Sequence, residues 1–130
     1  IQLTVVQTVA LAGVVVVTTP QEVALIDARK AVAMFDKTNV RVLGIVENMS
    51  YFLCPSDGVR YDIFGHGGGE REASRLGVPL LGEIPIDMAT REASDTGMPL
   101  VARSQDSPIG REFMKISQAV RAAAETPVSD

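Results

Sequence analysis

The chain has 130 residues, of which 46% are hydrophobic and 22% are charged, and its formal net charge at pH 7 is -4. This size and composition are typical of one globular domain, and the acidic balance argues against nucleic acid or an anionic membrane as a partner. Because Cys54 is the only cysteine, no internal disulfide can form, and we expect a reducing, cytoplasmic location. The apolar run Val9–Val17 is far shorter than the roughly 20 residues of a membrane-spanning helix.

The first predicted elements along the chain are a helix, a strand and a second helix. Apolar residues at helical spacing predict a helix over Gln2–Ala12, and the β-branched run Val14–Val17 predicts a strand buried on both faces. Thr19, Pro20 and Glu22 fit a capping box that begins the second helix. The buried face of that helix is predicted from its apolar spacing: Leu25, Ala28, Val32 and Phe35.

The middle of the chain continues the alternation of strands and helices. A second strand is predicted over Val40–Val46, and a loop is predicted over Tyr51–Gly69. A short helix over Glu70–Leu76 would end at Gly77, and a third strand would follow over Leu80–Ile84.

The last part of the chain holds two more predicted helices. Asp87 caps the first, which ends before Gly97, and the second opens at Ser107–Pro108. A loose tail is predicted over Glu125–Asp130, so residues 1–124 would form the folded part. The second of these helices carries one apolar stripe: Ile109, Phe113, Ile116 and Val120.

Buried strands that alternate with helices predict an α/β fold, in which a parallel sheet is covered by helices on both faces. Ligands bind such sheets at the carboxyl ends of the strands. Three stretches would lie there: Thr18–Gln21, Glu47–Ser50 and Ile84–Asp87. Within them, the Asn48 side chain can both donate and accept, as recognition of adenine N6 and N7 requires. The alternative for Asn48 is local hydrogen bonding in a turn.

Five stretches, in the same order and spacing, resemble the Mrp/NBP35 family of iron–sulfur cluster carrier ATPases. They are VVVVTTPQEVALIDAR, LGIVENMSYFLCP, IFGHGG, GVPLLGEIPID and RE-x-x-D-x-G-x-P, at 14–29, 43–55, 63–68, 77–87 and 91–99. The resemblance implies the C-terminal part of a doubly wound, mostly parallel sheet of P-loop NTPase type, related to MinD and ParA. It also implies a homodimer that binds ATP with Mg²⁺, holds an iron–sulfur cluster between its subunits and passes it to apo iron–sulfur proteins.

The resemblance also implies roles for particular residues. It assigns Asn48 to base recognition, places Pro85 and Asp87 in a turn that wraps the adenine, and places Cys54 in the cluster loop. No catalytic residue is expected here, because no Gly-Lys pair of a phosphate loop occurs in the chain. Ile1 is therefore expected to lie just past the catalytic half, and this piece alone is expected neither to hydrolyse ATP nor to bind it tightly.

The cluster loop departs from the family at Asp57, which stands where the second cysteine of Cys-Pro-x-Cys is expected. One thiolate per chain would then be available, although four-iron clusters normally take four. Two chains would supply two Cys54 thiolates, and Asp57 could add oxygen ligands. Two alternatives stay open: Cys54 as an ordinary half-buried residue, and a ParA/MinD-like positioning or regulatory ATPase without a cluster. His66 is expected in a flexible glycine-rich loop.

Overall fold

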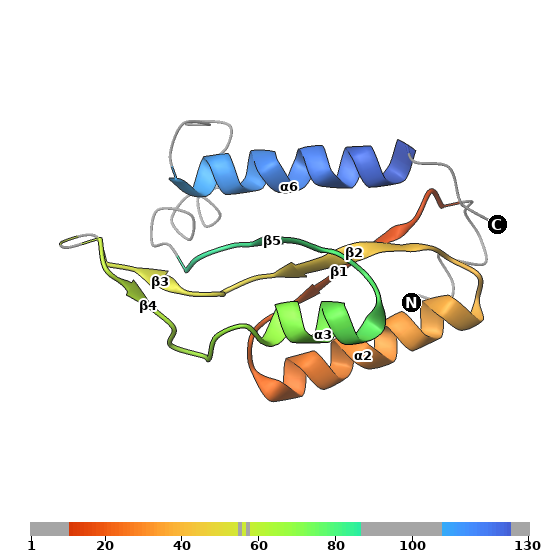
Figure 1. Ribbon diagram of the computed structural model, residues 1–130, viewed down its shortest axis with the longest axis horizontal. Coiled ribbons are helices and arrows are strands. Elements are labelled where there is room, and N and C mark those ends of the chain that lie inside the picture. The colour runs from red at the N-terminus through yellow and green to blue at the C-terminus, as the bar shows by residue number, and fades with distance from the viewer. Residues whose placement is uncertain (1–10, 55, 57, 87–107, 126–130) are drawn as a thin grey trace, which may run out of the picture.

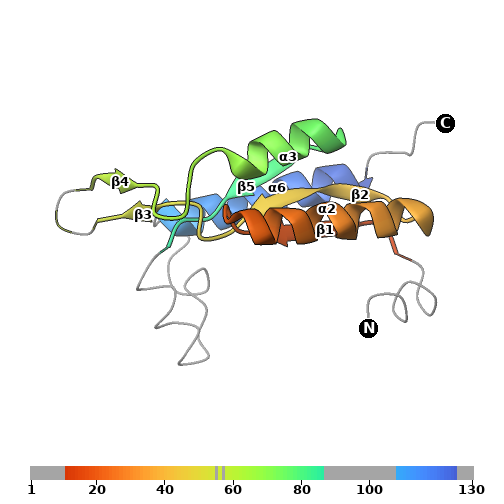
Figure 2. The same ribbon diagram turned by 90° about the horizontal axis from the view of Figure 1, so that it is seen from below.

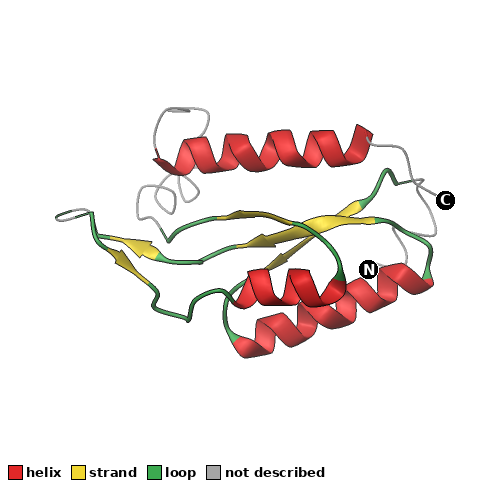
Figure 3. Ribbon diagram, viewed as in Figure 1, coloured by secondary structure: helices red, strands yellow, loops and turns green. Residues whose placement is uncertain are grey.

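In the described part of the chain, helices lie on both sides of a parallel sheet, which gives three layers (Figures 1 and 3). The computed structural model describes residues 11–54, 56, 58–86 and 108–125. The helix predicted after Asp87, and nearly all of the one predicted over Gln2–Ala12, lie outside these described residues. The described elements are β1 (Val14–Thr18), α2 (Glu22–Lys37), β2 (Val42–Glu47), β3 (Phe52–Leu53), β4 (Arg60–Tyr61), α3 (Gly68–Leu76), β5 (Leu80–Glu83) and α6 (Pro108–Glu125).

The three strands predicted from the sequence form one parallel sheet, in the order β1-β2-β5. Their bounds differ from the predicted ones by one or two residues. β2 lies in the centre, and its last residue, Glu47, pairs with Thr18 of β1 on one side and with Glu83 of β5 on the other. The carboxyl ends of all three strands therefore meet at one edge, as the prediction of a parallel sheet requires.

Helices cover both faces of the sheet, and each face has its own hydrophobic core. The core under α2 and α3 consists of Val16, Ala28, Val32, Ile45 and Ala73. The core under α6 consists of Val46, Leu81, Ile84, Ile109 and Ile116. The apolar stripes predicted for the two long helices are buried or partly buried, which confirms both. No helix in the described part of the chain combines the length and apolar character needed to span a bilayer.

The capping box predicted at the start of α2 does not form. α2 begins at Glu22, with Gln21 at the N-cap and no side-chain hydrogen bond at that cap. The reason is that β1 continues to Thr18, whose carbonyl accepts a hydrogen bond of 2.7 Å from the Asn48 N–H. The chain therefore turns from β1 into α2 over residues 19–21. The Thr19 hydroxyl, expected to cap, is buried and has no partner among the described residues.

The segment Tyr51–Gly69, predicted as a loop, contains a short antiparallel hairpin. β3 and β4 pair through two residues each, and Figure 2 shows the hairpin extending past the end of the main sheet. α3 then starts at Gly68 rather than at Glu70, and it ends as predicted at Gly77 in the left-handed conformation. Strands of two residues are too short to show an alternating pattern, so periodicity could not reveal the hairpin.

β2 has a glycine at residue 44, where β5 approaches too closely for a side chain. A Cβ at this position would lie 2.6 Å from Leu81 Cγ and 2.7 Å from the carbonyl oxygen of Pro79. That carbonyl is fixed, since it accepts a hydrogen bond of 2.9 Å from the Ile45 N–H. Gly44 thus allows β5 to lie against β2 and to bring its last residues to the common edge of strand ends.

An ion pair between Arg29 and Glu72 ties α2 to α3. Arg29 donates from Nη2 to Oε1 at 2.6 Å and from Nε to Oε2 at 3.3 Å, so the contact is bidentate. The hydrogen bond from Arg29 lowers the pKa of the Glu72 carboxyl below its ordinary value of 4.5. The Arg29 side chain is 44% exposed, and solvent screening therefore limits what the pair contributes to stability.

Glu72→Gln is expected to lower the free energy of unfolding at neutral pH and to have little effect in acid. Because the folded-state pKa of Glu72 is depressed, the pair stabilises the fold above the unfolded pKa, and this stabilisation is lost as pH falls through the folded pKa. Urea unfolding at a series of pH values measures the difference from the wild type. Glu125→Gln, which breaks the exposed Arg121–Glu125 pair on α6, is the matched control. A Glu72→Gln difference that persists undiminished in acid would contradict the assignment.

Candidate functional site

The candidate site lies at the edge where the three parallel strands end. Asn48 directly follows β2, and the turn Ile84–Ile86 follows β5. Backbone hydrogen bonds hold the two extensions together: Ile84 N–H donates to the Glu47 carbonyl at 2.8 Å, and Ile86 N–H donates to the Tyr51 carbonyl at 2.7 Å. The segments that follow β2 and β5 therefore run side by side beyond the sheet.

Asn48 is held tightly at the end of β2. Its backbone N–H donates to Thr18, and its Oδ1 accepts a hydrogen bond of 2.9 Å from the Met49 N–H. That second bond accompanies a left-handed Met49, with φ of 51°. The local turn predicted as the alternative for Asn48 is thus present, but it occupies only the oxygen. Among the described residues, nothing forms a hydrogen bond with the Nδ2 group, which leaves a donor for a ligand.

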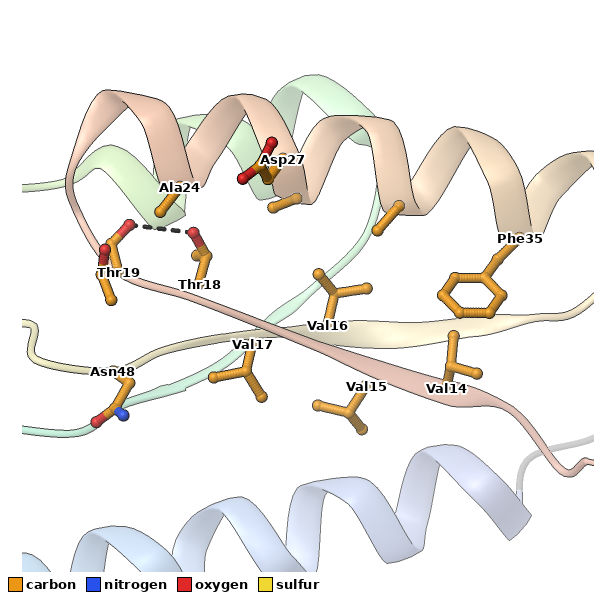
Figure 4. A pocket seen from close by; sticks show the side chains of 12 residues that line it. Val14, Val15, Val16, Val17, Thr18, Thr19, Ala24, Asp27, Phe35 and Asn48 are labelled. Atoms are coloured by element: carbon orange, nitrogen blue, oxygen red, sulfur yellow. Dashed lines mark hydrogen bonds between the residues drawn. The ribbon is translucent and has the colours of Figure 1, made fainter. Parts of the chain in front are cut away.

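A groove of about 610 Å³ runs along β1 and is bordered by α2. In Figure 4, Asn48 lies near Thr18 and Thr19 at the end of β1, and Asp27 and Ala24 of α2 lie above the threonines. The rest of the groove is lined mainly by valines of β1 and apolar residues of α2. β1 is an edge strand of the described sheet, so the groove is open on the side away from β2.

Pro85 lies in the turn after β5, between the two residues whose N–H groups bind the extension of β2. It is not among the residues that line the groove beside Asn48. Asp87, predicted to share the purine site, lies outside the described residues. Asn48 and Pro85 therefore lie at the same edge of the sheet, but of the two Asn48 alone lines the groove.

Cys54 lies at the end of the hairpin, directly after β3. Two hydrogen bonds close the turn beyond it: Cys54 N–H donates to the Val59 carbonyl at 3.1 Å, and Gly58 N–H donates to the Cys54 carbonyl at 2.8 Å. The half-buried thiol lies 3.1 Å from Ser56 Oγ. Asp57, which stands in the place of the second cysteine, lies outside the described residues.

The described residues contain no cluster of three or more His, Cys, Asp or Glu side chains that could hold a metal ion. His66, which is 67% exposed, has its Nδ1 atom 3.3 Å from Arg60 Nη2 and 3.6 Å from Asp62 Oδ1. Its neighbours are therefore a cation and a single carboxylate. Within one described chain, Cys54 is left as the soft ligand that an iron–sulfur cluster would need.

A buried polar network at the end of β2 was missed from the sequence. Glu47 is 1% exposed, and its carboxylate accepts hydrogen bonds from Ser50 Oγ at 2.6 Å and from the Gly69 N–H at 3.0 Å. Ser50 Oγ also lies 2.8 Å from Glu83 Oε2, so it bridges carboxylates of β2 and β5. A Cβ on Gly69 would lie 3.2 Å from the Glu47 carboxylate. One feature of the sequence could have indicated this network: Glu47 directly continues an apolar strand that was predicted to be buried.

Solved structures with this arrangement define the class of protein. The chain superposes on the septum site-determining protein MinD from Pyrococcus horikoshii, solved with Mg-ADP, with a TM-score of 0.65 and 27% identity over 85% of this chain and 42% of that one. A nucleotide-binding protein from Archaeoglobus fulgidus, solved with ADP, gives a TM-score of 0.63 and 39% identity over 78% of this chain and 40% of that one. The fold is that of a MinD-type P-loop ATPase.

Sequence comparison places the chain within that class. It belongs to the ParA family, described as NUBPL iron-transfer P-loop NTPases, whose pattern matches residues 1–121. It is 46% identical over 129 residues to the iron-sulfur cluster carrier protein of Aquifex aeolicus, covering 99% of this chain and 35% of the relative. It is 53% identical over 116 residues to that of Pyrococcus abyssi, covering 89% and 39%. The chain thus spans 35% to 39% of the length of these curated relatives.

Ser50→Ala is expected to lower the free energy of unfolding by about 1–3 kcal/mol, because it leaves a buried carboxylate oxygen of Glu47 without its hydroxyl partner. Urea unfolding of wild type and variant measures the loss. Ser74→Ala, on the exposed face of α3, is the matched control and should change the stability by less than about 0.5 kcal/mol. Equal effects of the two substitutions would show that the network does not stabilise the strand ends.

Proposed function

We propose that this chain is the C-terminal part of an ATP-dependent iron–sulfur cluster carrier. In this proposal it supplies the adenine side of the nucleotide site and one thiolate for the cluster. The observation that carries the proposal is structural: the hairpin with Cys54 is attached to the same strand ends that present Asn48. The family and the names of the relatives support a role for this hairpin in binding an iron–sulfur cluster.

The nucleotide is proposed to bind with its base against Asn48 and the turn of Pro85 and Asp87. The Asn48 Nδ2 group can donate to adenine N7 while its Oδ1 accepts from the N6 amine, since a carbonyl oxygen has two lone pairs. The phosphate-binding lysine and the Mg²⁺ site are assigned to the rest of the full-length polypeptide, because the chain contains no Gly-Lys pair. ATP hydrolysis thus belongs to the whole protein, and residues 1–124 alone are proposed to be inactive.

The iron–sulfur cluster is proposed as cargo that is bound between two copies of the protein. One chain offers Cys54 as a soft ligand, and a two-fold homodimer would bring two such thiolates together. Asp57 of each chain, or thiols from other molecules, would complete the coordination. Recipients are proposed to be apo iron–sulfur proteins, and a reducing compartment such as the cytoplasm would keep the thiolates available.

A ParA/MinD-like regulatory ATPase without a cluster is the second candidate function. It is favoured by the single soft ligand in the described part of the chain and by the MinD structures on which the fold superposes. Cluster reconstitution separates the two candidates, because only the carrier requires Cys54.

Cys54→Ala is expected to abolish, or reduce several-fold, the visible chromophore formed when the full-length protein is reconstituted anaerobically with iron and sulfide. Loss of the thiolate removes a soft ligand that oxygen donors replace poorly. Absorbance and iron content per protein measure the effect. Ser56→Ala, which removes the hydroxyl 3.1 Å from the thiol, is the control and should retain the chromophore. Equal and colourless wild-type and Cys54→Ala samples would favour the ATPase without a cluster.

Asn48→Asp is expected to weaken ATP and ADP binding by the full-length protein about tenfold, or roughly 1.4 kcal/mol. The aspartate keeps the acceptor for the Met49 N–H but replaces the Nδ2 donor with an oxygen that repels adenine N7. Titration calorimetry measures the affinity. Asn39→Asp is the control, because it makes the same change at an asparagine between α2 and β2, away from the strand ends. Unchanged affinity in Asn48→Asp would remove Asn48 from the base site.

A further inference from the structure

We infer that Arg60 is a positioning residue, which holds the hairpin that carries Cys54 against the ends of β2 and β5. The inference concerns a side chain outside the proposed base site and outside the ligand set. The hairpin is small, and several contacts converge on the Arg60 guanidinium group.

The hairpin needs anchors from outside its own two strands. β3 and β4 are paired only through Phe52↔Tyr61 and Leu53↔Arg60. An isolated two-stranded hairpin is marginally stable at best in water, and one with two residue pairs is shorter than most. The tilted stacking of Phe52 on Tyr61, with ring centroids 6.4 Å apart, adds only a modest contribution.

β3 has its own connection to the main sheet. The Ile86 N–H donates to the Tyr51 carbonyl at 2.7 Å, and Phe52 forms a parallel bridge with Ile86. These bonds fix the strand that leads into Cys54. They do not fix β4 or the far side of the turn, which return from Cys54 toward α3.

Arg60 supplies the connection from β4. Its guanidinium carbon lies 4.1 Å from the centre of the Tyr51 ring, in a cation–π contact. Its Nη2 lies 3.7 Å from Glu83 Oε2 at the end of β5. Its Nε donates to Asp62 Oδ1 at 3.1 Å, which orients the guanidinium plane. One side chain of β4 thus contacts the extension of β2, the end of β5 and the segment that leads to α3.

The partners of Arg60 are themselves fixed. Burial raises the pKa of the Tyr51 hydroxyl, and Glu112 adds to that rise, so the ring under the guanidinium stays a neutral phenol. Glu83 is held through its backbone, whose N–H donates to Glu112 Oε1 of α6 at 3.1 Å. The Glu83 carboxylate also lies 2.8 Å from Ser50 Oγ, which donates to buried Glu47, the residue next to Asn48. The guanidinium thus forms an ion pair with one carboxylate of the network at the strand end that presents Asn48.

The positioning role and a purely electrostatic role predict opposite effects on the thiol. Loss of a nearby cation disfavours the thiolate and slows alkylation. Loss of an anchor instead lets the hairpin open, which exposes the half-buried thiol and speeds alkylation. Arg60→Lys keeps the positive charge but lacks the planar group that stacks on Tyr51 and reaches Glu83.

The test uses the full-length protein without nucleotide or cluster. In Arg60→Ala, alkylation of Cys54 by iodoacetamide, followed on its own peptide by mass spectrometry, is expected to be about three- to tenfold faster than in the wild type. Amide exchange should accelerate at Cys54 and Gly58, whose N–H groups close the turn, and should be unchanged in β2. Arg60→Lys should give an intermediate alkylation rate, and Arg121→Ala on α6 should match the wild type.

Unchanged or slower alkylation in Arg60→Ala would overturn the inference. So would faster exchange that extends to the amides of β2, because the substitution would then have loosened the sheet as a whole. Glu83→Gln, which weakens the same anchor from β5, should change the alkylation rate in the same direction and by a smaller factor.

The importance of Arg60 for cluster binding rests on the proposed function. After reconstitution, Arg60→Ala should lose its chromophore to a chelator several-fold faster than the wild type. A colourless wild type would refute the carrier function and leave the alkylation result valid. A coloured wild type together with unchanged alkylation in Arg60→Ala would refute only the positioning role.

Discussion

The arrangement of the strand ends depends on one buried carboxylate. Glu47 ends the central strand at 1% exposure, and a charge or polar group in such a place is costly unless it is hydrogen-bonded. Ser50 and the Gly69 N–H meet that requirement, and each comes from a different part of the chain. The carboxylate thereby joins β2, its own extension and the start of α3. Asn48 and the hairpin are placed where they are because both continue from this fixed point.

The two edge strands of the described sheet, β5 and β1, differ in how far other parts of the chain cover them. On β5, the N–H of Glu83 is occupied by Glu112 of α6, so a side chain closes part of that edge. On β1, a groove of about 610 Å³ lies open along an apolar strand. An exposed strand edge of this kind is suited to pairing with further polypeptide, and the curated relatives are more than twice as long as this chain. In the described part of the chain, the edge of β1 is therefore available for pairing with a further strand.

Periodicity was sufficient to predict the layers of this fold but not the contacts at the site. The stripes on α2 and α6 follow from burial, which repeats along each helix. The prediction that Val14–Val17 is buried on both faces was wrong, because β1 is an edge strand of the described sheet and its Val17 side chain is 62% exposed. The Thr19 capping box failed because a strand hydrogen bond at Thr18 took precedence over a local signal. The Arg60–Glu83 contact and the Glu47–Gly69 hydrogen bond join residues that are distant in sequence, and no local pattern encodes such pairings. Asn48 was singled out by its place at a strand end and by the resemblance to a family, and Cys54 by that resemblance; the roles of both stay predictions.

The close approach of Gly69 to Glu47 constrains how the sequence can evolve. A methyl group at residue 69 would lie 3.2 Å from the Cβ and from the carboxylate of Glu47, so the Glu47 side chain would have to shift slightly to admit even alanine. The glycine and the glutamate lie 22 positions apart in the sequence, yet each restricts which residue the other position can hold. Substitutions at residues 47 and 69 are therefore expected to be coupled, because a side chain at residue 69 would require the Glu47 side chain to shift.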